Sequence, residues 1–160
     1  MTSELTLAEQ AVFDALTKSI PSSSPSTEAV YNLGTKYKTG KGVAKDVCRA
    51  AELYRLAAVR GHAKAQCSLG TMHEYGKGVA KDLAEAARLY RLAAVRGHAN
   101  GQNNLGTMYK YGKGVAKDLA EAARLYRLAA DQGHANAISA QQNLSRMPTP
   151  KTQPQESAKK

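Results

Sequence analysis

Apolar residues recur along the middle of the chain at spacings of three and four, the period of a helix that is buried on one side. Ala29, Leu33 and Tyr37 fall on one face of a helix that we expect over about residues 29–39. Glycines then interrupt the pattern, and a second apolar stripe follows, formed by Ala50, Leu53, Tyr54, Ala57 and Ala58. The pattern therefore predicts two short helices joined by a glycine-containing loop, and no strands.

This pair of helices is repeated. Three blocks of 36 residues align without a gap at 29–64, 65–100 and 101–136, and the second and third blocks differ at only seven positions. The phrase GKGVAKD begins at Gly40, and again at 76 and 112. Because a hairpin of this size cannot bury its own apolar face, the repeats predict an all-α solenoid in which neighbouring hairpins cover one another.

The helix ends carry signals of their own. Asp46, Asp82 and Asp118 each stand where the N-cap of a second helix belongs. Glu85 and Glu121 follow three residues after their aspartates, which predicts a capping box in the second and third blocks. The first block has Arg49 at that position, so we expect its second helix to start less well. Glycines at 61, 97 and 133 are expected to end the second helices in the left-handed conformation.

Segments of different composition flank the repeats. Residues 1–28 are interpreted as an N-terminal helix followed by a Pro/Ser linker, in which the helix covers the first repeat. Residues 137–146 keep the helical phase and predict a C-terminal capping helix. Residues 147–160 contain three of the five prolines and three lysines, and we expect a disordered basic tail.

Composition narrows the class of protein. The 160 residues include no Trp and one Phe, and much of the apolar share is alanine, which suits short helices in close contact. No apolar run approaches the roughly 20 residues of a membrane span. The formal charge is +10, and the first block alone contributes +6. This charge raises the possibility of an anionic partner.

Together these residues resemble a known family. Each block contains the pattern A-x-x-x-L-G-x-x-Y-x-x-G-x-G-V-x-x-D followed by x-x-x-A-x-x-x-Y-x-x-A-A-x-x-G, with Gly101 and His73 as departures. The pattern is similar to the Sel1-like repeat (SLR) family, a relative of the tetratricopeptide repeats, and covers 108 of the 160 residues. The resemblance implies an α/α right-handed superhelix that serves as a scaffold or adaptor for protein or peptide partners, with no catalytic residues.

Candidate chemical groups are few. Cys48 and Cys67 each occur in only one block, and we expect free thiols. Three histidines at 62, 98 and 134 follow the helix-ending glycines; one per repeat is too far apart to share a metal, so we expect them to pack or to cap a turn. No catalytic set, metal site or cofactor motif is recognised, and the lone cysteines and the absence of an export signal favour a cytoplasmic location.

Three surfaces are candidates for binding. In this family the first helices line the concave surface, and most differences between the second and third blocks fall there. The candidate partner-binding residues on this face are Tyr31, Asn32, Thr35, Lys36, Cys67, Ser68, Thr71, Met72, Asn103, Asn104, Thr107 and Met108.

In each of the other two surfaces, side chains of the same kind recur at equivalent positions of successive repeats. Loop lysines form the alternative site, for an anion or a nucleic acid: Lys41, Lys45, Lys77, Lys81, Lys113 and Lys117. An apolar ladder on the second helices consists of Leu56, Leu92 and Leu128 with Val59 and Val95, and it is a candidate seat for a partner or a terminal helix.

Overall fold

The computed structural model describes residues 26–148, and this range folds into seven α-helices without a strand. The helices are α2 (Thr27–Thr39), α3 (Val47–Val59), α4 (Ala63–Tyr75), α5 (Leu83–Val95), α6 (Ala99–Tyr111), α7 (Leu119–Asp131) and α8 (Ala135–Arg146). The all-α prediction is confirmed. The predicted N-terminal helix and all but the first two residues of the predicted tail lie outside the described residues.

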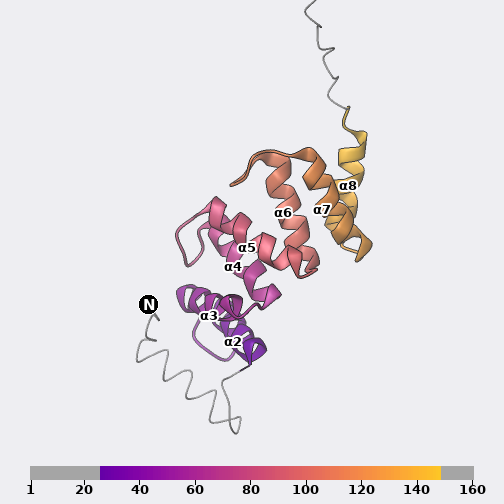
Figure 1. Cartoon of the computed structure of the whole chain (residues 1–160). Coiled ribbons are helices and arrows are strands. Elements are labelled where there is room, and N and C mark those ends of the chain that lie inside the picture. The colour runs from indigo at the N-terminus through magenta and orange to yellow at the C-terminus, as the bar shows by residue number, and fades with distance from the viewer. Residues whose placement is uncertain (1–25, 149–160) are drawn as a thin grey trace, which may run out of the picture.

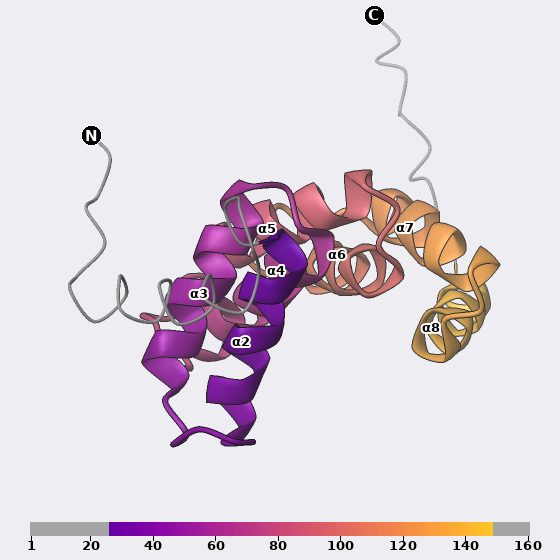
Figure 2. The same cartoon turned by 90° about the horizontal axis from the view of Figure 1, so that it is seen from below.

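Consecutive helices pair into hairpins, and the hairpins follow one another as a curved array (Figures 1 and 2). Helices α2 and α3, α4 and α5, and α6 and α7 make the most extensive contacts, as the repeats predict. Each second helix also packs against the first helix of the next repeat, and α8 packs against α7 at the end of the array. No described helix has the length and hydropathy to cross a membrane.

The second helices begin at the predicted aspartates. The carboxylate of Asp82 accepts a hydrogen bond of 3.0 Å from the backbone N–H of Glu85, and Asp46 and Asp118 make the same bond. The capping-box prediction is wrong in its second half. The backbone N–H of Asp82 already donates to the carbonyl of His73, so the Glu85 side chain has no capping donor to accept from. The Glu85 carboxylate accepts instead from Arg88, one helical turn further on.

Helix α3 shows none of the expected weakness at its start. It is 13 residues long, like α5 and α7, and it has the same N-cap bond. Arg49, which replaces the glutamate, lies over the ring of Tyr37 at 5.4 Å from its centroid. This contact with the preceding helix takes the place of the Glu–Arg pair of the later repeats.

Histidines start the first helices of the later hairpins. The Nδ1 atoms of His62, His98 and His134 accept the backbone N–H groups of Ala65, Gly101 and Ala137 at 3.1–3.3 Å. This confirms the interpretation that these histidines cap turns. An accepting Nδ1 leaves the ring proton on Nε2, which in His62 faces Glu28 at 2.7 Å. The observed hairpins consequently begin at residues 27, 63 and 99, two residues before the blocks defined from the sequence.

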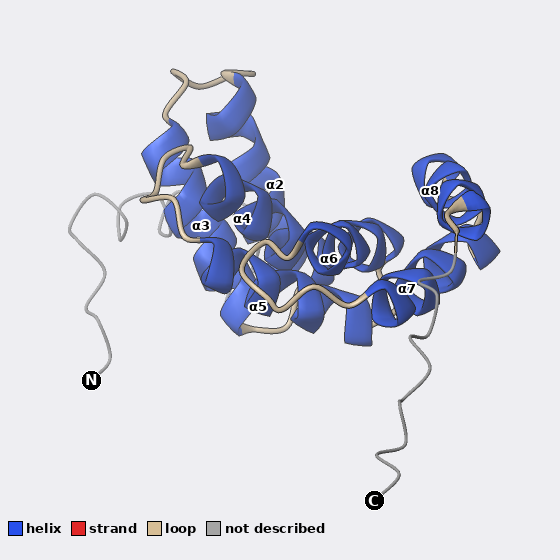
Figure 3. Cartoon of the chain, turned by 90° about the horizontal axis from the view of Figure 1, so that it is seen from above, coloured by secondary structure: helices blue, strands red, loops and turns tan. Residues whose placement is uncertain are grey.

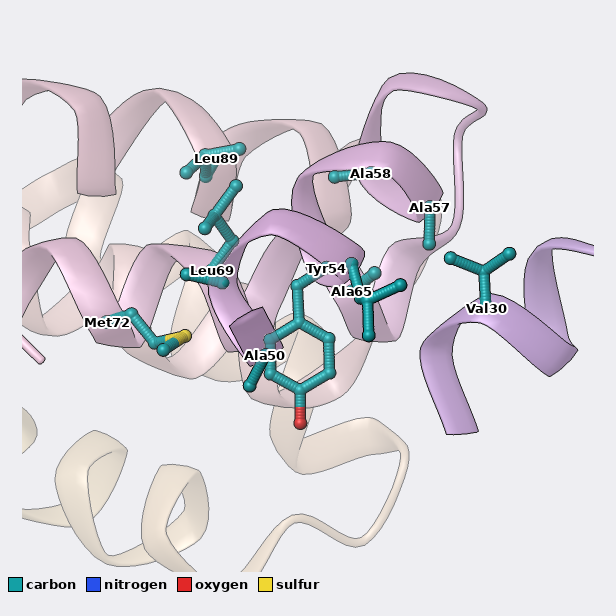
Figure 4. Close-up of a cluster of buried hydrophobic side chains, with 11 residues drawn as sticks. Val30, Ala50, Tyr54, Ala57, Ala58, Ala65, Leu69, Met72 and Leu89 are labelled. Atoms are coloured by element: carbon teal, nitrogen blue, oxygen red, sulfur yellow. The ribbon is translucent and has the colours of Figure 1, made fainter. Parts of the chain in front are cut away.

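The core is built from alanines that surround one tyrosine per repeat. Tyr54, Tyr90 and Tyr126 are all at most 1% exposed. Figure 4 shows the first of these clusters, in which Tyr54 lies among side chains from four consecutive helices, including Ala50, Ala65 and Met72. Because each cluster takes residues from two adjacent hairpins, the core runs along the array.

A glycine in each first helix makes room for the buried tyrosine. A Cβ atom on Gly70 would lie 2.8 Å from Cε1 of Tyr90, and one on Gly34 would lie 2.9 Å from Cε1 of Tyr54. Contacts this short force a neighbour to move, and the tyrosine is held on all sides. The glycines therefore allow the two helices of a hairpin to approach closely, as predicted for Gly34.

The loops that join the two helices of each hairpin are drawn in tan in Figure 3, and in the second and third hairpins they also contact the preceding repeat. Gly78 has a positive φ of 71°, and a Cβ atom there would lie 2.6 Å from the carbonyl oxygen of Val47 at the start of α3. Gly114 lies in the same way against Leu83 at the start of α5. Gly42 in the first repeat has no such neighbour within 4 Å, because no described repeat precedes it.

Helix α8 is the first helix of an incomplete fourth hairpin. It includes the predicted capping helix of residues 137–146 and starts two residues earlier, at the N-cap His134. Only Ala137 of α8 is buried. Gln141 and Leu144, at the positions of the buried Leu105 and Met108, are half-buried, because no second helix of the same hairpin covers them within the described residues.

Candidate protein-binding surfaces

The twelve candidate residues of the first helices differ in accessibility. Asn32 and Lys36 are exposed, and seven others are half-buried: Tyr31, Thr35, Ser68, Thr71, Asn103, Asn104 and Thr107. Cys67, Met72 and Met108 are buried in the core. Burial removes these three from the set that can contact a partner. Met72 and Met108 pack against the preceding hairpin, and Cys67 packs in the cluster that its hairpin shares with the following one.

Lys36 is exposed for the same geometrical reason. It occupies the position of Met72 and Met108 in the 36-residue register. Those methionines pack against the preceding hairpin, and the first hairpin has no predecessor among the described residues. Lys36 therefore lies at the N-terminal end of the array and not within the face that α4 and α6 share.

A threonine in each first helix is engaged with the buried tyrosine. The hydroxyl of Thr35 lies 3.1 Å from the hydroxyl of Tyr54, and Thr71 and Thr107 make the equivalent contacts at 3.1 and 3.0 Å. Each threonine hydroxyl also donates to the carbonyl four residues earlier. These side chains hold the two helices of a hairpin together, so their hydroxyls have little capacity left for a partner.

The first helices of neighbouring repeats meet at this surface. The amide Nδ2 of Asn104 on α6 lies 3.9 Å from the sulfur of Cys67 on α4, and Asn103 donates to Asn104 at 3.3 Å. The contact joins α4 and α6. We call the polar side chains of the three first helices on this side the first-helix face: Asn32, Ser68, Glu74, Asn103, Asn104 and Lys110. Glu74 and Lys110 belong to this face in addition to the twelve candidate residues, and both positions differ between the second and third blocks.

Glu74 gives the second repeat a hydrogen bond that the other two repeats lack. Its carboxylate accepts a hydrogen bond of 2.7 Å from the hydroxyl of Tyr90. Lysines occupy the corresponding positions, 38 and 110, in the other repeats. The pKa of Tyr90 is raised above its usual range, first by burial and further by the adjacent carboxylate.

All six predicted loop lysines are exposed. They lie on the three loops at residues 40–46, 76–82 and 112–118, each of which continues from the left-handed glycine that ends a first helix (Figure 3). The contacts of Gly78 and Gly114 with the preceding repeat bring successive loops to the same side of their hairpins. We call this set of exposed loop lysines the basic edge: Lys41, Lys45, Lys77, Lys81, Lys113 and Lys117.

Two tyrosines accompany this basic edge, and the sequence interpretation missed them. Tyr75 and Tyr111 end α4 and α6 and are 62% and 59% exposed. Lys77 lies 5.8 Å from the centroid of Tyr75, and Lys113 lies at the same distance from Tyr111. The sequence contains the pattern that could have revealed them: in both repeats a tyrosine stands directly before the loop glycine, outside the apolar stripe of the first helix.

The apolar ladder of the second helices is exposed as predicted. Val59 and Val95 are each 82% exposed, and Leu92 and Leu128 are about half as exposed. Leu56 is half-buried and packs against the core of the first repeat. This outer ladder lies on the C-terminal halves of α3, α5 and α7.

The described residues contain no cluster of His, Cys, Asp and Glu that could hold a metal ion. Both cysteines are free thiols: Cys48 is exposed, and Cys67 is buried. Burial raises the pKa of the Cys67 thiol to about 11, so this sulfur stays protonated and unreactive at neutral pH.

We compared the chain with family models and with curated protein sequences. The family model of the Sel1 repeat matches three consecutive stretches, residues 27–62, 63–98 and 99–134. These stretches coincide with the starts of the observed hairpins. A comparison with curated protein sequences found no match.

Several solved structures of repeat proteins are similar to this chain. The protective antigen c5321 of uropathogenic Escherichia coli, which displays an SLR fold, is 39% identical, with a TM-score of 0.70 over 71% of this chain. A Sel1 repeat protein from Oxalobacter formigenes is 34% identical, with a TM-score of 0.70 over 74% of this chain. The chain spans 24% and 49% of the lengths of these two proteins.

A third structure, the cysteine-rich protein B (HcpB) of Helicobacter pylori, shares the fold at 22% identity and a TM-score of 0.60, over 71% of this chain and 92% of that protein. The predicted right-handed α/α superhelix is confirmed by these likenesses together with the repeat match. With three tandem matches that fill most of its length, the chain belongs to the Sel1 repeat family.

Proposed function

We propose that the protein is a non-enzymatic scaffold that binds a protein or peptide through the first-helix face. Sel1 repeat proteins are generally protein–protein interaction scaffolds. The partner would lie along the concave surface, where the first helices of successive repeats stand side by side. We place this activity in the cytoplasm, a location that the unpaired Cys48 and Cys67 support.

The observation that carries the proposal is the polar contact between Asn104 and Cys67 across the repeat boundary. It joins α4 and α6 into one surface at positions that differ between two otherwise nearly identical repeats. The residues that build the hairpins, such as Gly70 and Tyr90, are the same in both. A repeat framework held constant while its adjoining polar positions change is what selection for one partner would produce.

The side chains of the first-helix face are suited to binding an extended, polar peptide of the partner. Asn103 and Asn104 offer amides, which both donate and accept hydrogen bonds and so match the backbone of a peptide. Glu74 and Lys110 add opposite charges one repeat apart. We therefore expect a peptide whose backbone groups bond to the asparagines. It should carry a positive charge opposite Glu74 and a negative charge opposite Lys110.

A substitution series tests the proposal. Asn32, Ser68 and Asn104 occupy the same position in three successive first helices, so the triple variant N32K/S68K/N104K alters the face once per repeat. The matched control is V59K/V95K on the outer ladder. Partners captured from the native host on the immobilised chain should be retained by the control and lost by the triple variant. Equal capture by both variants would exclude the first-helix face.

Binding of a single-stranded nucleic acid at the basic edge is a second candidate function. The observation that favours it is the pair of exposed tyrosines, Tyr75 and Tyr111, beside the loop lysines. Base stacking on an aromatic ring next to cationic groups is the usual mode of sequence-independent binding to single strands. The charge-only basic edge predicted from the sequence thus has aromatic side chains as well.

Salt and substitution separate this candidate from nonspecific attraction. An oligonucleotide bound through lysine–phosphate contacts should lose affinity steeply between low and high salt. Y75A/Y111A should weaken binding about tenfold or more without changing the salt slope, whereas K77A/K113A should reduce the slope. Affinity that is insensitive to salt, or to the tyrosines, would count against this mode.

A further inference from the structure

A pocket of about 280 Å³ opens between α7 and α8, at the C-terminal end of the array. Figure 1 shows that no described helix lies beyond α8. The pocket is mostly apolar, with one cation at its edge, and it is lined by Leu119, Ala120, Ala123, Arg127, Gln141, Leu144, Ser145, Met147 and Pro148. An engineered cavity of about 150 Å³ accepts benzene, so this pocket has room for an aromatic ring.

The preceding repeat shows what such a surface receives. The residues of α5 that correspond to the α7 wall are Leu83, Ala84, Ala87 and Arg91. There, Tyr109 of the next repeat packs against the core that contains Leu83 and Ala87. The guanidinium of Arg91 donates a 2.8 Å hydrogen bond to the Tyr109 hydroxyl. This surface is therefore a receptor for a tyrosine side chain within the array.

At the end of the array the receptor is kept and the tyrosine is missing. The α7 residues are identical to those of α5, but Ser145 stands at the position of Tyr109. The Ser145 hydroxyl turns back to the carbonyl of Gln141 at 2.9 Å. Ala87 is 2% exposed, while the equivalent Ala123 is half-buried. Arg127 makes no hydrogen bond or ion pair within residues 26–148.

The sequence of residues 149–160 differs from the loop that follows the tyrosine earlier in the array. In the array, the loop after the tyrosine lies against the receptor through Gly114, at φ +67°. The corresponding position in the sequence, 150, is a proline and not a glycine. Residues 149–160 also contain no aromatic side chain. We therefore consider a ring supplied by a partner protein.

A second copy of the chain is disfavoured by charge. Its most exposed tyrosines, Tyr75 and Tyr111, each lie beside lysines, which would approach Arg127 with the same sign of charge. The whole chain carries a net charge of +10. An acidic segment meets the opposite situation, because its carboxylates are attracted to Arg127.

We propose that the pocket between α7 and α8 binds a tyrosine side chain from an acidic segment of a partner protein, with Arg127 donating a hydrogen bond to the phenol oxygen. The ring would cover Leu119, Ala123 and Leu144, as Tyr109 covers the corresponding residues one repeat earlier. The site is separate from the first-helix face, and it gives the scaffold a second contact at its end.

A peptide titration of the full chain tests the assignment. The probe is the acetylated peptide Glu-Glu-Tyr-Glu-Glu, with Glu-Glu-Phe-Glu-Glu and Lys-Lys-Tyr-Lys-Lys as matched controls, followed by NMR of the protein. We expect saturable shifts at Leu119, Ala123 and Leu144. Loss of the phenol hydroxyl, or R127A, should weaken binding about fivefold, in line with one lost charge-assisted hydrogen bond. The lysine peptide should bind more weakly still.

Two variants fill the pocket from within. S145Y restores the tyrosine of the preceding repeat, so it should abolish binding of the acidic peptide and leave the fold intact or stabilised. A123L closes the same space by a different route, and it keeps the test decisive should S145Y fold poorly. Equal affinity for the tyrosine and phenylalanine peptides, or unchanged binding to both variants, would overturn the proposal.

Other occupants give distinct results. A dimer of the wild-type chain that S145Y converts to a monomer in sedimentation would assign the pocket to a second copy. Resonances of residues 149–160 that shift in S145Y would assign it to the chain's own tail. Either result would overturn the proposal. Because no residue of the first-helix face takes part in the titration, its failure would leave the proposed function unaffected.

Discussion

The hydroxyl of Tyr90 donates a hydrogen bond of 2.7 Å to the carboxylate of Glu74, sixteen residues earlier in the chain. The two residues belong to the two helices of the second hairpin. Tyr90 is 0% exposed, and Glu74 lies at the edge of the first-helix face. The bond therefore connects the core of the repeat directly with the surface that we propose as a binding site.

Substitution of Glu74 by Gln should destabilise the second hairpin. A hydrogen bond to a charged group contributes more than one to a neutral group, so E74Q should lower the free energy of unfolding by about 1 kcal/mol. The matched control is K110Q at the same position of the third repeat, where we expect a change below about 0.5 kcal/mol. Urea denaturation measures both. Equal losses for the two variants would show that the Tyr90–Glu74 bond contributes nothing.

Alanine at Gly70 should be harmful even though it favours a helix. Alanine is better than glycine inside a helix by about 1 kcal/mol. Here the added Cβ would lie 2.8 Å from Cε1 of Tyr90, whose ring has no free space to move into. We expect a net loss of about 2 kcal/mol in G70A, measured by thermal or urea denaturation.

A double-mutant cycle identifies the cause of that loss. In the background Y90L, where the shorter side chain leaves room for a methyl group, G70A should be nearly neutral. A loss of the same size in both backgrounds would place the conflict elsewhere in the hairpin.

The loop glycines allow a test with a built-in control. Both Gly42 and Gly78 have positive φ, at 76° and 71°, so alanine costs about 1 kcal/mol of backbone strain at either position. At Gly78 the new Cβ would also meet the carbonyl oxygen of Val47 at 2.6 Å, whereas at Gly42 it meets nothing within 4 Å. G78A should therefore cost about 3 kcal/mol and G42A about 1 kcal/mol. Similar values for the two variants would mean that the loops do not fasten one repeat to the next.

Stability should fall in mild acid because of His98. Burial lowers the pKa of this histidine, and the positive charges of Lys64, His62 and His134 lower it further. The unfolded chain then binds the proton more readily than the folded one, so this contribution to stability is complete above the unfolded pKa of about 6.5. It is lost as the pH falls from that value through the lower pKa of the folded state. Protonation also removes the Nδ1 lone pair that caps Gly101.

Two variants test whether His98 and its neighbour Lys64 cause this pH dependence of stability. H98N keeps an N-cap that does not titrate, so its unfolding free energy should change less than that of the wild type between pH 7.5 and pH 5. K64E copies the first repeat, where Glu28 faces His62 at 2.7 Å, and should raise the pKa of His98 in an NMR titration. A pKa that does not respond to K64E would show that Lys64 is not a cause of the shift.

Much of this fold could be predicted because the same signals recur three times. The apolar spacing, the Asp46 type of N-cap and the left-handed Gly61 each depend on bonds within a few residues, and the structure confirms them. The close approach at Gly34 was also accessible, since a glycine inside a helix calls for a neighbour that needs the space.

The capping box failed because it depends on a contact between helices. Nothing in the spacing of Asp82 and Glu85 reveals that the Asp82 N–H is already bonded to His73. The candidate site failed in part for the same reason. Helical phase placed Met72 near Thr71, but only the packing of one hairpin on the next decides that Met72 is buried and Lys36 is not.

The contacts of Gly78 with Val47 and of Gly114 with Leu83 imply a modular route for change in this protein. Each loop recognises the start of the previous second helix through groups that every unit provides. A tandem duplication or deletion of one 36-residue unit would consequently join surfaces that already match. The reach of the scaffold can therefore change in whole steps of one hairpin, while the residues on its first helices change one at a time.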